Sequence, residues 1–255
     1  MMPQWFPISV LLGVLNLDVT AFGQFMVSRP IVVGPLVGWV MGQPGLGLEI
    51  GAIIELIWIG DVPVGAHLPP DLLMLTGIST ACAAGLLNGR VPAEAAVTFG
   101  MCVGIPLALF STEVENIMRK LHVRWMHFAQ RMAMSGHFRT FEWVNWLIFL
   151  ELFLKAFLVA AASLAAAQLA SKVFFLFSDH VIEGLYSAYW LLLALGCSAV
   201  IDLLVEKKTA VYLAFSIACA GLAVFFRVPG VYLVSLMVFA GLVLALVLSR
   251  KGEPA

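Results

Sequence analysis

Four carboxylates lie within or beside one strongly apolar stretch of the chain, residues 29–71. They are Glu49, Glu55, Asp61 and Asp71. A carboxylate at membrane depth is costly, so it normally faces the interior of a helix bundle or a wet cavity and marks the path of a solute or an ion. Carboxylates also accept strong hydrogen bonds from hydroxyl groups. The stretch therefore predicts a binding site for a polar solute.

Prolines and glycines interrupt the same stretch. The prolines are Pro30, Pro35, Pro44, Pro63, Pro69 and Pro70. Glycines recur at four-residue steps, first Gly34, Gly38 and Gly42, then Gly47 and Gly51. This spacing puts small residues on one helical face, where two backbones in lipid approach closely. Transporters build solute sites from broken helices of this kind, because irregular backbone survives in a bilayer only where protein or water satisfies it.

Composition places the whole chain in the membrane class. Of its 255 residues, 62% are hydrophobic and 11% are charged, against about 45–50% and about 25% in soluble proteins. The mean hydropathy is +1.02. A net charge of -1 provides no basic surface for nucleic acid. P-loop, H-E-x-x-H, G-x-S-x-G and C-x-x-C motifs are absent, so we predict no cofactor, no metal and no catalytic nucleophile.

The apolar runs predict an all-α polytopic integral membrane protein with about eight or nine membrane helices. They cover 5–17, 31–41, 46–59, 72–87, 95–110, 144–169, 187–204, 210–226 and 231–248. The runs at 31–41 and 46–59 are each shorter than a full crossing. They form either a tilted pair or a re-entrant hairpin, so we expect broken or re-entrant segments near 31–71.

We interpret 1–255 as a single membrane domain with four parts. These are a broken-helix, substrate-carrying part at 1–110, a cytoplasmic amphipathic interval at 111–142, a helical bundle at 143–249 and a cytoplasmic tail at 250–255. The interval at 111–142 has apolar residues at helical steps and several basic residues, which is typical of a helix on the membrane surface. Basic residues in short loops place this interval and the C-terminus in the cytoplasm.

Two features of the spans have alternative interpretations. The first run is too short to cross alone unless its helix continues through 21–27, which would bury Asp18 and Gln24. Otherwise Asp18 caps a helix start at the membrane surface. In the sixth run, Glu151 and Lys155 have the i,i+4 spacing of an ion pair; a proton relay is the other interpretation.

The stretch at 29–71 also carries a resemblance to a known family. Its segments read RPIVVGPLVGWVMG and GAIIELIWIGDVPVGAHLPPD. Together they resemble the membrane component IIC (enzyme IIC) of the mannose/fructose/sorbose class of the phosphoenolpyruvate-dependent sugar phosphotransferase system. The resemblance covers essentially the whole chain. The length of the chain and its basic interval near 111–142 also fit the family.

The resemblance implies a function in sugar transport across the bacterial cytoplasmic membrane. The IIC component of this family recognises and conducts a hexose or amino-hexose while a soluble IIB component phosphorylates the sugar. It works with a second membrane component, IID, and the assemblies are trimers of IIC–IID pairs. The soluble phosphocarriers IIB and IIA carry the phosphohistidines, so IIC takes part in a phosphotransferase complex without a phosphorylated residue of its own. The lipid bilayer is the remaining partner.

By motif position, the resemblance assigns the sugar-binding role first to Glu55 and Asp71, which would accept hydrogen bonds from sugar hydroxyls. Gln24 and His67 are second choices. Asp71 follows Pro69-Pro70 and also fits a helix N-cap. Trp58 is either a surface on which a sugar stacks or, in the simpler interpretation, a core or lipid-facing aromatic.

Two other functions fit the residues without the resemblance. The first is a proton-coupled secondary transporter of a small polar solute, which would use Glu55, Glu151 and Lys155 for protons. The second is a membrane scaffold protein that transports nothing.

Overall fold

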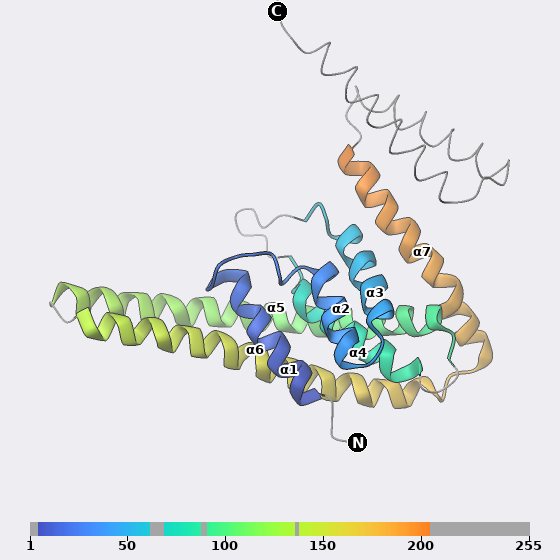
Figure 1. The fold of residues 1–255 in the computed structure, drawn as a ribbon, viewed down its shortest axis with the longest axis horizontal. Helices are drawn as coiled ribbons and strands as arrows, with labels where there is room; N and C mark the ends of the chain where they lie inside the picture. Colours follow the sequence, from blue (N-terminus) through green and yellow to red (C-terminus); the bar gives the residue numbers. More distant parts are fainter. Residues whose placement is uncertain (1–4, 62–68, 88–90, 136–137, 205–255) are drawn as a thin grey trace, which may run out of the picture. The chain divides into compact units, whose positions relative to one another are not determined.

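The structure is a computed structural model that describes residues 5–61, 69–87, 91–135 and 138–204. The chain divides into two compact units, Met1–Val200 and Ile201–Ala255, and almost all described residues belong to the first. Seven helices occupy the described ranges (Figure 1). They are α1 (Trp5–Thr20), α2 (Pro30–Val40), α3 (Pro44–Ile57), α4 (Leu72–Leu87), α5 (Ala93–Met134), α6 (Phe138–Phe174) and α7 (Asp179–Leu204).

The predicted all-helical membrane class is confirmed. Three helical stretches are long and apolar enough to cross a membrane, namely Ala93–Met134, Trp146–Phe174 and Asp179–Leu203. The second of these contains most of the span predicted at 144–169. The predicted helices at 210–226 and 231–248 lie outside the described residues, so the total of eight or nine stays a prediction.

Helices α2 and α3 form a tightly packed hairpin. Each begins with a proline at its first helical position, where the missing N–H costs no hydrogen bond. A Cβ added to Gly34 would meet the backbone oxygen of Gly47, and one added to Gly51 would meet that of Pro30. The turn between the helices contains Gly42 at a φ of +76°, which glycine adopts without strain. The predicted close approach of two backbones is confirmed here.

The core is organised around α4, which packs against α1, α2, α3, α5 and α6. Most of its side chains are buried, including Met74, Leu75 and Ile78. Helix α5 approaches α4 closely, since a Cβ at Gly100 would meet the backbone oxygen of Ser79. A Cβ added to Gly85, near the end of α4, would meet nothing within 4 Å, so this glycine is not needed for close packing.

Helix α5 does not end where the sequence changes character. We expected a membrane helix to stop near residue 110 and a separate amphipathic interval to follow at 111–142, but α5 continues to Met134 as one helix of 42 residues. No glycine or proline occurs between 111 and 134, so nothing in the local sequence breaks the helix. The polar interval therefore comprises the far half of α5, a short connection and the start of α6.

The first membrane helix is shorter than one of the two predicted alternatives, in which it continued through 21–27. Helix α1 stops at Thr20, so it does not continue through 21–27. The alternative role of Asp18 as the cap of a helix start is also wrong. Its carboxylate instead accepts hydrogen bonds from the N–H of Phe25 at 2.7 Å and the N–H of Ser28 at 3.2 Å. Asp18 thereby orders the connection between α1 and α2.

The hairpin contacts give a first testable prediction. Gly34→Ala places a methyl group against the carbonyl of Gly47, where neither backbone can yield without moving a helix. We expect a loss of about 1–3 kcal/mol in the free energy of unfolding, read as a fall of roughly 2–4 °C per kcal/mol in the unfolding midpoint of the detergent-solubilised protein.

Gly45→Ala is the matched control, because a Cβ at Gly45 in the first turn of α3 meets nothing within 4 Å. Its midpoint should stay the same or rise slightly. Equal midpoints for Gly34→Ala and Gly45→Ala would show that the two backbones are not in contact.

Candidate functional site

A polar cavity of about 290 Å³ lies among α1, the α1–α2 connection, the residues before α4, α5 and α6. Six of its fifteen lining residues are charged, in a chain that is 11% charged overall. Its polar lining residues are Asn16, Ser28, Arg29, Asp61, Asp71, Thr112, Glu115, Arg119 and Lys155. Its volume is close to the lower end of the range for small-molecule sites, about 300 Å³.

Asp71 lines this cavity and is held from both sides. One carboxylate oxygen accepts the N–H of Met74 at 3.1 Å, so Asp71 caps the start of α4 as its position after two prolines predicted. The other oxygen accepts the hydroxyl of Ser111 at 2.6 Å. The backbone N–H of Asp71 donates to the hydroxyl of Thr112 at 3.0 Å. These contacts fix the carboxylate between α4 and α5.

Glu55 lies in the last turn of α3 and does not line the cavity itself. One oxygen lies 3.3 Å from a guanidinium nitrogen of Arg29, and the other accepts the N–H of Ile31 at 3.4 Å. That N–H belongs to the first turn of α2, where no carbonyl within the helix is available. Because Arg29 does line the cavity, Glu55 acts on the cavity wall through its partner rather than by facing Asp71.

The predicted ion pair between Glu151 and Lys155 is wrong. The Nζ atom of Lys155 lies 2.5 Å from Oε2 of Glu115 on α5, and the Lys155 side chain is only 2% exposed. Arg119 adds a second cation, 3.4 Å from the other oxygen of Glu115. Glu151 lies 3.6 Å from His122 instead. The reason is that α5 and α6 pack side by side, so these side chains find partners across the helix interface rather than along one helix.

Of the remaining predicted residues, Gln24 and Trp58 do not line the cavity. Gln24 lies in the exposed α1–α2 connection at a φ of 51°, a conformation in which a non-glycine residue is strained. Trp58 ends α3 and packs, half-buried, against the core, which supports its structural interpretation. His67 lies outside the described residues.

Sequence reasoning missed Asn16, Ser28, Thr112 and Glu115. No spacing rule brings them together, because they come from two helices and a connection. Asn16 is buried, and its amide nitrogen lies 3.4 Å from the carbonyl oxygen of Leu152 on α6. The available signal was a polar residue inside an otherwise apolar run, which Asn16 provides in α1.

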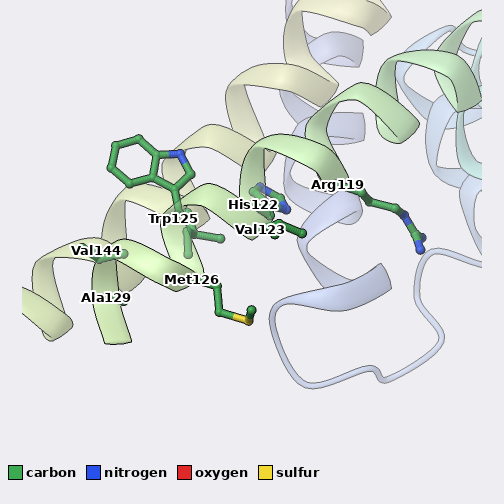
Figure 2. A pocket seen from close by; sticks show the side chains of 8 residues that line it. Arg119, His122, Val123, Trp125, Met126, Ala129 and Val144 are labelled. Carbon is green, nitrogen blue, oxygen red and sulfur yellow. The ribbon is translucent and has the colours of Figure 1, made fainter. Parts of the chain in front are cut away.

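A second cavity, of about 440 Å³, lies farther along α5 and α6 (Figure 2). Its lining is mainly apolar, with Val123, Met126 and Ala129 from α5 and Val144 from α6. Arg119 lines this cavity as well as the polar one. The polar cavity has far more hydrogen-bonding groups, so it is the candidate site for a polar solute.

Comparison with known proteins identifies the family. The sequence profile of the family described as "PTS system sorbose-specific iic component" matches residues 3–247. The chain belongs to this family. It is therefore a multi-pass protein of the bacterial inner membrane and a IIC component of the mannose/sorbose type, as the resemblance in the sequence indicated.

Three relatives illustrate the match. The chain is 28% identical to the mannose-specific EIIC component of Escherichia coli (strain K12) over 144 residues, which are 56% of this chain and 50% of that protein. It is 30% identical to the putative N-acetylgalactosamine permease IIC component 2 of the same organism over 46% of this chain and 88% of that one. Identity to the sorbose-specific EIIC component of Klebsiella pneumoniae is 23%, over 91% and 85%. The match thus spans half the length of the mannose-specific relative.

Two solved structures share the fold. One, described as "Structure of membrane protein", superposes with a TM-score of 0.71 at 19% identity and covers 100% of this chain and 99% of that chain. The other is the mannose transporter ManYZ in complex with microcin E492, with a TM-score of 0.53 at 24% identity over 99% and 96%.

The cross-helix ion pair gives the second prediction. Glu115→Gln leaves the buried Lys155 ammonium without its carboxylate and should cost up to about 3–5 kcal/mol. Lys155→Met should cost less, because Glu115 keeps Arg119 as a partner. The double variant should recover most of the loss caused by Glu115→Gln alone. Unfolding midpoints of the purified chain measure all three effects.

Glu151→Gln is the matched control, since Glu151 makes no ion pair with Lys155. If Glu151→Gln lowered the midpoint as much as Glu115→Gln, the pairing across α5 and α6 would be refuted.

Proposed function

We propose that this chain is the sugar-recognising and sugar-translocating component of a mannose-class phosphotransferase system. It holds a hexose or amino-hexose while a partner IIB component phosphorylates it. One observation carries the proposal: a chain of this family has a charge-lined cavity of about 290 Å³ among its apolar helices. A polyhydroxy compound is the kind of solute that uses so many donors and acceptors in so small a space.

The chemistry of the lining suits a sugar. Asp71 and Glu115 offer carboxylate oxygens that accept hydrogen bonds from hydroxyl groups, whereas Arg29 and Lys155 offer donors. The charges on the wall also balance. The cations are Arg29, Arg119 and Lys155, and the anions are Asp61, Asp71 and Glu115. Because the wall has no net charge, it has no excess charge to select a small ion. It can instead hold a polyhydroxy compound through hydrogen bonds.

In this proposal Asp71 contacts the sugar directly and Glu55 acts by holding Arg29 at the cavity wall. The Ser111 hydroxyl that now donates to Asp71 can exchange with a sugar hydroxyl, because both are neutral donors of the same kind. Gln24 and His67 remain secondary candidates for contact with the sugar.

The assembly follows the family. We propose a IID component as the partner within the bilayer, soluble IIB and IIA components as the phosphoryl donors, and trimers of IIC–IID pairs. The ManYZ name joins two components in one mannose transporter, which supports a two-component membrane part. The apolar runs at 210–226 and 231–248 would complete a set of eight or nine membrane helices. Residues 1–110 would carry the substrate together with the parts of α5 and α6 that line the polar cavity.

The third prediction tests the site. Asp71→Asn should lower sugar uptake at least about tenfold, because losing a hydrogen bond to a charged group costs about 1.5–3 kcal/mol. Glu55→Gln acts only through the half-exposed Arg29, so it should lower uptake less, by about two- to fivefold. Asn is as good an N-cap as Asp, so Asp71→Asn should leave the α4 cap and membrane insertion intact. The measurement is uptake of a panel of labelled sugars by cells that also produce the IIA, IIB and IID components.

Glu183→Gln is the control, because this α7 carboxylate is 80% exposed and lies outside the cavity. Cells with the Glu183→Gln variant should take up sugar as fast as cells with the unmodified chain. Full uptake by both Asp71→Asn and Glu55→Gln would remove these residues from the site.

The chemical form of the product separates the proposal from its alternatives. The phosphotransferase function predicts sugar phosphate inside the cells and no uptake without the IIB component. A proton-coupled transporter would release unmodified sugar in response to a pH gradient, and the buried Glu115–Lys155 pair beside the cavity is the feature that would serve it. A scaffold protein would bind no sugar at all.

A further inference from the structure

The far half of α5 is strongly basic. Residues 117–134 contain four Lys or Arg residues and no Asp or Glu. The four are Arg119, Lys120, Arg124 and Arg131. A helix of 42 residues is roughly 63 Å long, about twice the ~30 Å of bilayer hydrocarbon. Part of α5 must therefore lie outside the hydrocarbon, and its basic half is the part suited to the layer of lipid headgroups.

The facing part of α6 carries the aromatic residues expected at the same depth. Trp143 and Trp146 are 70% and 69% exposed, and tryptophan concentrates where the membrane meets water. Basic residues on α5 and tryptophans on α6 thus mark this end of the helix pair as an interfacial element.

The apolar cavity of about 440 Å³ opens between these two helices (Figure 2). Val123, Met126, Ala129 and Val144 form its apolar wall, and Arg119 and His122 lie at one end of the group of labelled residues. The indole N–H of Trp125, also in the lining, is buried and has no hydrogen-bond acceptor within the described ranges. The cavity therefore combines an apolar slot, an end formed by Arg119 and His122, and an unused donor.

We propose that this cavity binds one anionic phospholipid of the surrounding membrane. The phosphate lies at the Arg119 and His122 end, and an acyl chain lies along Val123, Met126 and Val144. Arg119 and His122 also lie near carboxylates, Glu115 at 3.4 Å and Glu151 at 3.6 Å. Residues 117–134 add three further cations, Lys120, Arg124 and Arg131, and no acidic residue, so the surroundings still favour an anionic headgroup. The apolar wall favours an acyl chain because burying its CH₂ groups removes apolar surface from water. A free phosphate would leave the apolar wall empty, and a sugar would find too few polar partners there.

The apolar cavity and the polar cavity have one lining residue in common, and a further cavity of about 410 Å³ shares residues with both. Arg119 lines both cavities and lies 3.4 Å from Glu115. A bound headgroup therefore shares the guanidinium that helps to hold Glu115 beside Lys155. The lipid site stands whichever solute the chain carries, because none of its other lining residues belongs to the polar cavity.

The fourth prediction tests lipid binding on the full-length chain, purified together with its membrane partner and stripped of lipid. Native mass spectrometry follows the addition of phosphatidylglycerol or phosphatidylcholine. We expect one phosphatidylglycerol to bind at least about tenfold more tightly than phosphatidylcholine. Met126→Trp fills the slot from a position that is 57% exposed and should abolish this preference. Arg119→Gln keeps the slot but removes the cation, so the binding of phosphatidylglycerol should weaken to the level of phosphatidylcholine binding.

Met134→Trp is the matched control, because Met134 lies on the same helix, is 81% exposed and is not part of the lining. It should bind phosphatidylglycerol like the unmodified chain. Equal binding of the two lipids would overturn the proposal, as would full retention of phosphatidylglycerol by both Met126→Trp and Arg119→Gln. Binding by the isolated chain that is lost in the complex would show that a protein partner covers the cavity, which also overturns it.

Discussion

A buried cation on α6 sets the arrangement on which the site depends. Lys155 is almost completely enclosed, and a lone ammonium in an apolar bundle would lose its hydration without compensation. Glu115 on α5 supplies that compensation, and Arg119 completes the group. The requirement for a partner therefore fixes the register of α5 against α6. It also brings charged residues to a place where they line a cavity rather than merely neutralise one another.

A second constraint, the close approach of two backbones, governs the hairpin of α2 and α3. The carbonyl of Gly47 occupies the space that a Gly34 side chain would need. Such an interlocked pair has little freedom to change internally, since packed interiors resist small displacements. Arg29 immediately precedes α2 and is paired with Glu55 from the end of α3. The hairpin therefore holds one wall residue of the polar cavity in place.

Much of this architecture was predictable, because it follows from local chemistry. Proline at helix starts, glycine at four-residue steps and an aspartate after two prolines each have a local cause. The structure bears out the tight α2–α3 approach and the Asp71 cap. The partner of Lys155 was not predictable in the same way. Spacing along one helix favoured Glu151, but the energy of a buried charge depends on what the neighbouring helix presents, and the spacing along one helix does not contain that information. The length of α5 was also missed, because a change from apolar to polar composition alters the surroundings of a helix without breaking its backbone.

The position of Arg119 shows how a single long helix serves two environments. On one side it faces the carboxylate of Glu115, which belongs to the polar cavity, and on the other it reaches the mainly apolar cavity toward the basic end of α5. A long arginine side chain suits this boundary, because its apolar stem packs against hydrophobic neighbours while its planar head makes several hydrogen bonds at once. If α5 had ended at residue 110, as composition alone suggested, neither Glu115 nor Arg119 would be held beside Lys155. The continuity of α5 is therefore what connects the polar cavity inside the bundle with the basic end of the same helix.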